Sequence, residues 1–148
     1  LGYDIATTLI STERVPAPTR VREHLNLPAG AEVIAVIRLR TVDGKPLSVH
    51  RSFVPASLAP GLDQLDVVNE QLCVVLEDKF NLSMKSVSED LEVIVAEGTD
   101  AKLLELRKGD PALLLTDVIT NPAGTAFEYS TIVFRGDTVR LKFDYKRE

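Results

Sequence analysis

Apolar and polar residues alternate over several stretches of the chain, and this alternation predicts a structure built mainly from β-strands. The clearest stretch covers residues 32–42, where every second side chain of an extended strand would share one face. The same pattern, bounded by Gly, Pro, Asn and Asp, predicts further strands at residues 3–14, 47–54, 86–96, 112–120, 127–134 and 139–145. Strands therefore make up most of the expected secondary structure.

One longer helix is predicted at residues 69–80, where the apolar spacing changes from two residues to three and four. An amphipathic helix repeats its apolar side chains at i, i+3, i+4 and i+8. The apolar residues with this spacing are Leu72, Val75, Leu76 and Phe80. Asn69 is the expected N-cap. Shorter helices are predicted over residues 19–25 and 100–106.

A repeat relates the two halves of the chain. Residues 24–30 match residues 103–109 around a corner of sequence L-x-L-x-x-G, and Gly44 and Gly124 occupy equivalent predicted turns 80 residues apart. Helix–hairpin units can recur by chance, but a shared corner and turn at nearly one offset favour duplication. The predicted fold class is α+β: an antiparallel β-sheet with packed helices and an internal pseudo-repeat.

Composition narrows the classes of function. The chain has 148 residues, is 45% hydrophobic and 26% charged, and carries a net charge of −5. These values fit one globular domain over residues 1–148 and exclude wholesale disorder. Nucleic-acid binders usually carry an excess of positive charge. Direct DNA binding by these residues alone is therefore not expected.

The cellular setting follows from the cysteine and hydropathy content. A single cysteine, Cys73, excludes an intramolecular disulfide and fits a reducing cytoplasm. No apolar run approaches the roughly 20 residues of a membrane helix, and no signal peptide is evident. The chain begins with Leu1 rather than Met. We therefore expect a cytoplasmic segment excised from a longer protein, with no membrane partner.

The two arginines at the end of the clearest strand are the most informative polar residues. Arg38 and Arg40 would share one face about 7 Å apart, in a row that begins with apolar residues. A face that changes from apolar to doubly cationic is typical of the edge of an anion-binding pocket. The alternative is that both arginines form surface ion pairs, each worth less than about 1 kcal/mol.

The turn after this strand decides which residues face the arginines. A type I turn with Gly44 as a bulge residue would place Ser48 opposite Arg38 and His50 on the same face. A two-residue turn would place Leu47 there instead. The first turn is expected, because the second copy of the repeat favours the same geometry.

Other reactive residues indicate little chemistry. His24 and His50 are 26 residues apart without a third ligand, so no metal site is expected. Cys73 near the start of a helix is more typical of a small packed residue than of a nucleophile. Sequence motifs of hydrolases, zinc proteases and P-loop proteins do not occur. We expect neither a cofactor nor catalytic residues.

An ordered set of short motifs resembles the UTRA domain, the effector-sensing part of HutC-type regulators in the GntR family of bacterial transcription factors. The motifs are residues 25–30 (L-x-L-P-x-G), 37–40 (IRLR), 43–46 (DGKP), 51–55 (RSFVP), 76–80 (LEDKF), 101–104 (AKLL), 128–130 (EYS) and 135–137 (RGD). The resemblance implies a fold like that of chorismate lyase, with a small-molecule pocket. It also implies a homodimer, and a winged helix-turn-helix DNA-binding domain before Leu1.

The resemblance also implies which residues line the pocket. In members that bind phosphorylated sugars, an R-x-R pair lies in the pocket and corresponds to Arg38 and Arg40. A Ser or Thr near the domain start corresponds to Thr7, and an acidic position corresponds to Glu128. The pocket is therefore expected to hold a small anionic metabolite.

Three positions depart from the pattern of the family. His50 stands where a Glu is common, Phe134 where a Tyr is usual, and Gln71-Leu72-Cys73 where Ser-Leu-Tyr usually begins the central helix. The ligand is therefore expected to differ from a phosphosugar: a carboxylate or a differently shaped phosphate ester. The expected effector-binding residues are Thr7, Arg38, Arg40, Ser48, His50, Gln71, Cys73, Glu128 and Phe134.

Three functions are compatible with this sequence. The first is an allosteric sensor that controls a DNA-binding domain, and it requires no catalysis. The second is an enzyme on the same fold, similar to chorismate lyase. The third is a domain that only dimerises, which a fully packed interior would favour. The first is the prediction.

Overall fold

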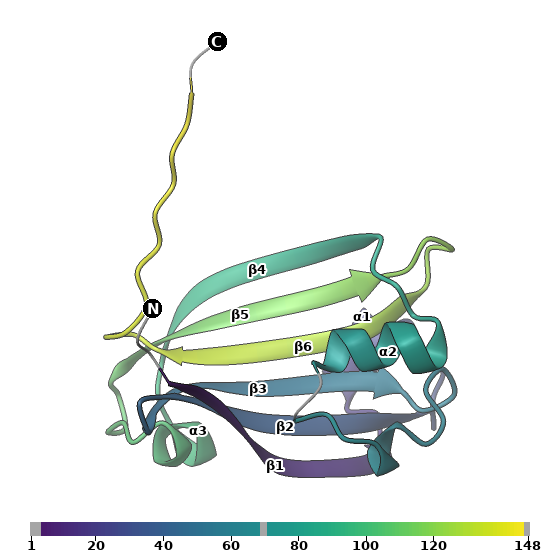
Figure 1. Ribbon diagram of the computed structural model, residues 1–148, viewed down its shortest axis with the longest axis horizontal. Coiled ribbons are helices and arrows are strands. Elements are labelled where there is room, and N and C mark those ends of the chain that lie inside the picture. Colours follow the sequence, from purple (N-terminus) through teal and green to yellow (C-terminus); the bar gives the residue numbers. More distant parts are fainter. Residues whose placement is uncertain (1–3, 69–70, 147–148) are drawn as a thin grey trace.

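The computed structural model describes residues 4–68 and 71–146 of the chain. Within them, one antiparallel sheet carries helices on both faces (Figure 1), as the α+β prediction required. The elements in chain order are β1 (Ile5–Pro16), α1 (Thr19–His24), β2 (Glu32–Val42), β3 (Lys45–Pro55), a 3-10 turn (Leu62–Gln64), α2 (Leu72–Phe80), β4 (Ser86–Val95), α3 (Gly98–Leu103), β5 (Pro111–Thr120) and β6 (Ala126–Arg135).

The sheet shows the predicted pseudo-repeat directly. The six strands of the described residues lie in the order β1-β2-β3-β6-β5-β4, so two β-α-β-β units meet at the β3–β6 pair. The corners also match: Asn26 and Glu105 have φ of 53° and 55°, and Gly30 and Gly109 have φ of 83° and 94°. Both halves therefore turn from helix to strand in the same way.

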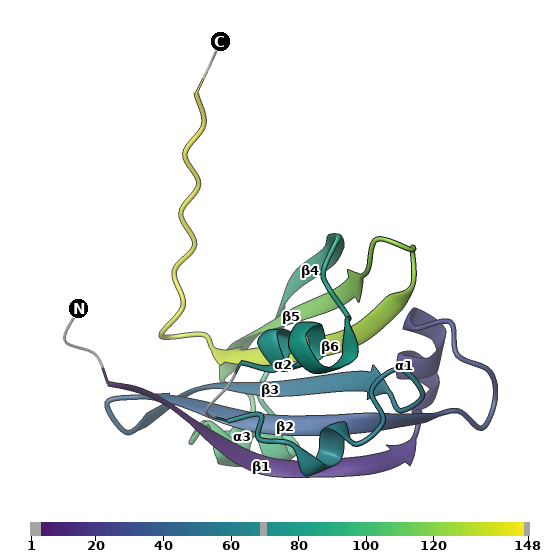
Figure 2. The ribbon, with the colours of Figure 1, turned by 45° about the vertical axis from the view of Figure 1, so that its right-hand side comes forward.

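Three hydrophobic clusters fix the helices on the sheet. Alternation sends Ile34 and Val36 of β2 to one face, where they pack with Val75 and Leu76 of α2. On the other face, α1 packs near Tyr129 of β6, and the end of α3 packs around β3 and β6. Figures 1 and 2 show α2 on one side of the sheet and α1 on the other.

The boundaries of the central helix differ slightly from the prediction. The helix begins at Leu72, with Gln71 at the N-cap position, and ends at Phe80. Asn81 then adopts a left-handed conformation with φ of 56°, which ends the helix. Asn69, the expected N-cap, lies outside the described residues.

The predicted strand at residues 139–145 is wrong for this chain taken alone. Residues 139–146, which we call the arm, run extended and away from the sheet (Figures 1 and 2). One reason is topological: β6, the preceding strand, already has β3 and β5 as neighbours, so the arm cannot fold back to pair with β6. A strand pattern requires a partner, and the described residues of this chain do not provide one.

Candidate functional site

A cavity of about 340 Å³ lies between the start of α2 and the sheet face that α2 covers. We call it the α2 cavity. Six of the residues expected from the sequence line it: Arg38, Arg40, His50, Gln71, Cys73 and Glu128. The remaining lining residues are Ser52, Leu72, Asp117, Ile119, Ser130 and Ile132.

The β2–β3 hairpin brings the cationic side chains together in a register that differs from the predicted one. Arg38 is opposite His50, and Arg40 is opposite Ser48. The prediction had placed Ser48 opposite Arg38, which is wrong by one step along the same face. The four side chains still share that face, because the error is an even number of residues.

A two-residue turn followed by a bulge produces this register. Asp43 and Gly44 both have positive φ, 50° and 78°, so they form the turn by themselves. Such a turn alone would direct Leu47 to the arginine face. Leu47 is instead an extra residue between successive pairs, and this bulge returns Ser48 to the face of the arginines.

The two arginines have buried donors without acceptors. The Nε atoms of Arg38 and Arg40 are buried, and neither has a hydrogen-bond partner in the described part of the chain. Burial lowers the pKa of Arg38, the negative charge of Glu128 opposes this effect, and the charge of Arg40 adds to it. An arginine in a protein nevertheless stays protonated. The cavity wall therefore holds two cations with unused hydrogen-bonding capacity.

His50 adds a neutral group beside the arginines. Burial, followed by the charges of Arg40 and Arg38, lowers the pKa of His50 to about 4. Its Nε2 is hydrogen-bonded to Ser48 Oγ at 2.8 Å. The imidazole is thus uncharged at neutral pH, and it contributes a polar atom rather than a third positive charge.

Glu128 on β6 lines the cavity and is buried. Burial raises the pKa of its carboxyl, while a hydrogen bond from Ser52 and the charge of Arg38 lower it. Arg38 and Glu128 therefore stabilise each other's charged forms in a poorly solvated place.

Asp117 is the acidic residue of the cavity that the sequence did not reveal. It lies on β5 opposite Ser130. Its Oδ1 is buried without a hydrogen-bond partner in the described residues. Burial raises the pKa of Asp117 to about 7, and a hydrogen bond with Glu89 and the charges of Glu89 and Glu128 add to this rise.

Three expected residues lie beside the cavity rather than along its wall. Thr7 on β1 is opposite Arg40, and Ser48 is fully buried behind His50. Phe134 on β6 is opposite Ser48. None of the three is among the lining residues. Their positions allow them to support Arg40 and His50.

The opening of α2 contributes polar groups. Gln71 precedes the helix and Cys73 lies in its first turn, and both line the cavity. The Cys73 thiol donates a hydrogen bond to Gln71 Oε1 at 3.6 Å. Cys73 is exposed rather than packed in the core, which corrects the interpretation of it as a small core residue.

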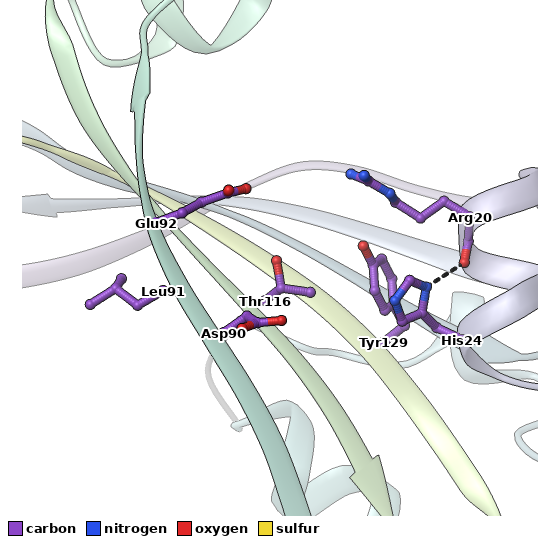
Figure 3. Close-up of a pocket in the computed structure, with 7 residues that line it drawn as sticks. All are labelled: Arg20, His24, Asp90, Leu91, Glu92, Thr116 and Tyr129. Atoms are coloured by element: carbon purple, nitrogen blue, oxygen red, sulfur yellow. Dashed lines mark hydrogen bonds between the residues drawn. The ribbon is translucent and has the colours of Figure 1, made fainter.

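A second, smaller cavity lies on the opposite face of the sheet, between α1 and β4 (Figure 3). Its volume is about 220 Å³, and it has Arg20 and His24 on the α1 side and Asp90 and Glu92 on the β4 side. The ring of His24 packs against that of Tyr129 in a tilted arrangement, with ring centroids 4.7 Å apart. Its charged side chains are exposed, and no described residue lining it has a buried polar atom without a partner. The α2 cavity is therefore the better candidate site.

Neither a metal site nor a membrane helix is found in the described residues. No group of three or more His, Cys, Asp or Glu side chains within residues 4–68 and 71–146 could hold a metal ion. In the same residues, no helix is long and apolar enough to cross a membrane.

Comparison with known proteins decides the family. The UTRA domain family matches residues 1–140. The chain belongs to the UTRA domain family. One relative, a probable fructoselysine utilization operon transcriptional repressor from Shigella flexneri, is 25% identical over 146 residues, which cover 99% of this chain and 60% of the relative. Another is the HTH-type transcriptional repressor NagR from Bacillus subtilis, 24% identical over 136 residues, with 92% and 56% covered.

Solved structures of regulator domains have the same fold. The C-terminal domain of a histidine utilization repressor from Pseudomonas syringae pv. tomato superposes with a TM-score of 0.89 at 18% identity, covering 97% of this chain and all of that domain. The effector domain of PhnF from Mycobacterium smegmatis gives a TM-score of 0.89 at 20% identity, with 99% and 90% covered.

These matches confirm the predicted family and class of function. The UTRA family match and the curated repressors given above support the interpretation as a domain of a transcriptional regulator over the interpretation as a lyase. The chain spans 60% or less of the length of the curated relatives given above.

Proposed function

We propose that this UTRA chain is one ligand-sensing domain, spanning residues 1–148, and that it binds a small anionic metabolite in the α2 cavity. The observation that carries the proposal is the pair of buried Nε atoms of Arg38 and Arg40 without partners at the cavity wall. A buried donor that lacks an acceptor costs about 1–3 kcal/mol. A carboxylate or phosphate ester supplies acceptors and negative charge at the same time.

Surface ion pairing, the alternative for the two arginines, does not describe these side chains. In the described part of the chain, the ion pairs within 4.0 Å involve other residues, such as Arg14 with Glu32. Arg38 interacts electrostatically with Glu128, but that partner is itself buried inside the cavity wall. The two guanidiniums are therefore available to a ligand rather than used for surface stability.

The position of the cavity suggests how ligand binding could be transmitted. A ligand there would contact the β2–β3 hairpin on one side and the start of α2 on the other. It would favour whichever arrangement of helix and sheet binds it more tightly, and such a population shift is the basis of allosteric control. We propose that this shift controls DNA binding by a winged helix-turn-helix domain in a cytoplasmic regulator, since the net charge of −5 does not suit DNA binding by these residues.

We further propose that the domain acts as a homodimer. Val93 and Val95 on the edge strand β4 are exposed, and so are Leu141 and Phe143 in the arm. In the described residues, β4 has a neighbour strand on one side only. A second copy of the chain supplies an arm for this edge, with period-2 alternation suited to a strand.

The anion site can be tested with hexyl phosphate as the probe. We expect Arg40→Ala to weaken its binding about tenfold or more in isothermal titration calorimetry, because the variant cannot donate a charge-assisted hydrogen bond to the phosphate. Arg38→Ala should weaken binding too, and should also lower the stability of the fold because it leaves Glu128 buried without its cation.

Arg14→Ala is the matched control, since Arg14 forms an exposed ion pair with Glu32 on β1–β2. It should bind hexyl phosphate as the wild type does. Equal affinities for wild type and Arg40→Ala would refute the site. As a separate experiment, native mass spectrometry of the purified wild-type chain can detect a retained anion, whose mass would identify the natural ligand.

A further inference from the structure

The charged side chains of the α2 cavity fall into one pair that compensates directly and two groups that do not, and this arrangement describes the ligand. Arg38 and Glu128 lie close enough to shift each other's pKa, and their charges compensate. His50 stays neutral because burial holds its pKa near 4. Two ionisable groups are then left without a compensating partner in the described part of the wall: Arg40 on β2, and Asp117 on β5, whose carboxyl is charged above about pH 7.

Unused hydrogen-bonding atoms mark the same two residues. Arg40 has a buried Nε–H without an acceptor, and Asp117 has a buried Oδ1 without a donor, as judged within residues 4–68 and 71–146. Buried polar atoms are nearly always paired in a folded protein, so unpaired ones require an explanation. A simple anion satisfies only the donor. A ligand that also donates would satisfy the acceptor of Asp117, in place of the proton that Asp117 shares with Glu89.

The chemistry around Asp117 favours a positively charged donor. Glu89 on β4 and Glu128 on β6 are the charged groups that act on Asp117, and both carry carboxyls. Carboxylates gathered in this way repel one another, and either a bound proton, which the raised pKa of Asp117 reflects, or a cation relieves the repulsion. On its own, an uncharged hydroxyl would satisfy the hydrogen bond but would leave that repulsion in place.

The sheet also sets the length of the ligand. The strands that carry Arg40 and Asp117 are separated by β3 and β6, which is three strand spacings or about 14 Å, and the registers place Asp117 four residues further along, or about 13 Å. Arginine and aspartate side chains reach part of the way across. Several ångströms remain, so a molecule whose two charges sit on neighbouring atoms, such as an α-amino acid, is too short.

We propose that the effector is an extended molecule with an anionic group at the Arg38–Arg40 end and an ammonium group at the Asp117 end. This inference rests on the anion site proposed above and adds a second recognition point. Asp117 is then the residue that distinguishes an amine-bearing ligand from its neutral analogue.

A set of three linear phosphates tests the inference: 6-aminohexyl, 6-hydroxyhexyl and hexyl phosphate. Dissociation constants are measured by isothermal titration calorimetry at pH 8 for the wild-type chain and three variants. We expect the wild type to bind 6-aminohexyl phosphate about tenfold more tightly than the other two, the effect of one partly buried charge pair.

The variants separate this inference from the anion site. Asp117→Asn, which keeps the shape of the side chain, should remove the preference for the amine without weakening hexyl phosphate binding, because it takes a negative charge away from an anion site. Asp90→Asn is the matched control: it removes one carboxylate from the other face of the sheet, and the preference should persist. Arg40→Ala should weaken all three phosphates by the same factor.

Two results would overturn the inference while the anion site stands. One is equal affinities of the wild type for the three phosphates. The other is a preference for the hydroxyl analogue, which would identify a neutral donor in the ligand. Retention of the amine preference by Asp117→Asn would also refute the role of Asp117. Failure of every phosphate to bind, or binding that Arg40→Ala does not weaken, would refute the anion site and this inference together. Circular dichroism of each variant confirms that it is folded.

Discussion

Burial acts on two residues of the α2 cavity in opposite directions. His50 and Asp117 both lie at the wall of a poorly solvated space, which disfavours a charged side chain of either sign. The pKa of the histidine therefore falls to about 4, and the pKa of the aspartate rises to about 7. Both side chains therefore favour their neutral forms. Binding of a charged ligand would shift them back toward their charged forms.

Asp117 should make the stability of the chain depend on pH. Its pKa is about 7 in the folded chain against an ordinary value of 3.8, because of burial and then Glu89 and Glu128. The unfolded chain releases this proton first, so rising pH between about 4 and 7 favours unfolding. Asp117→Asn should therefore leave stability unchanged near pH 4. At pH 8 it should raise the free energy of unfolding by about 1 kcal/mol, a figure reduced for the screening of a partly exposed group.

Urea denaturation at pH 4 and pH 8 measures this difference. Asp90→Asn, on the opposite sheet face, is the matched control for removing one carboxylate. A variant that is not more stabilised at pH 8 than at pH 4 would show that Asp117 is ionised freely in the folded chain.

Strand alternation explains which site residues could be predicted from the sequence. Arg38, Arg40 and His50 share one hairpin, so a period of two and one turn were enough to place them together. The same alternation could have identified Ser52 and Ser130, each two residues beyond a predicted site residue. Asp117 could not be found this way, because its neighbours in the site depend on the order of strands across the sheet.

At the scale of elements, each of the two hairpins contains a β-bulge that the sequence predicted only in part. Leu47 and Phe127, 80 residues apart, are both skipped in the strand pairing of their hairpins. The sequence predicted a bulge in both copies but placed the first one at Gly44. The position was wrong because Asp43 adopts positive φ, which Asp tolerates better than most residues, and so forms a two-residue turn with Gly44.

Helix α2 should depend on one buried leucine to hold its place over the cavity. Leu76 is fully buried in the cluster that joins α2 to the sheet. Leu76→Ala should lower the free energy of unfolding by about 2–4 kcal/mol, because less apolar surface is buried and a space is left behind. Val74→Ala is the control, because Val74 lies on the same helix with 42% of its surface exposed, and it should cost less than about 0.5 kcal/mol.

Chemical denaturation of the two variants and the wild type compares these costs. Leu76→Ala should also weaken hexyl phosphate binding, since the helix that covers the cavity is less firmly held. Equal stability of the two variants would mean that α2 is not anchored through Leu76.

The whole molecule is two similar units joined at the β3–β6 pair, and this explains why so much of the fold could be predicted. The repeat of corner and turn specifies the helix and hairpin of each unit. The arm is different. Its alternating pattern indicates a strand as clearly as the others, but its partner is not among the described residues of the same chain. Local pattern predicts the conformation of a strand, and only the complete assembly supplies its neighbour.

The proposed homodimer gives the arm that neighbour, and its charges favour β4. Phe143 and Tyr145 in the arm are 70% and 89% exposed, and Val93 on β4 is 75% exposed. Joining such surfaces removes apolar area from water at roughly 25 cal/mol per Å². In that dimer, acidic residues of β4 would lie beside a mostly basic arm; they are Glu89, Asp90 and Glu92 against Arg140, Lys142 and Lys146.

Sedimentation velocity of three altered chains tests this arrangement. The complete chain should sediment as a dimer, and a chain ending at Thr138 should be a monomer because the arm is missing. Val93→Asp should also be monomeric, since it places a charge on the apolar edge of β4 beside existing carboxylates. Ile5→Asp is the matched control: Ile5 is 62% exposed on β1, the opposite edge of the sheet, and its replacement should leave the dimer intact. A dimer that survives loss of the arm, or one that Ile5→Asp disrupts and Val93→Asp does not, would place the interface elsewhere on the molecule.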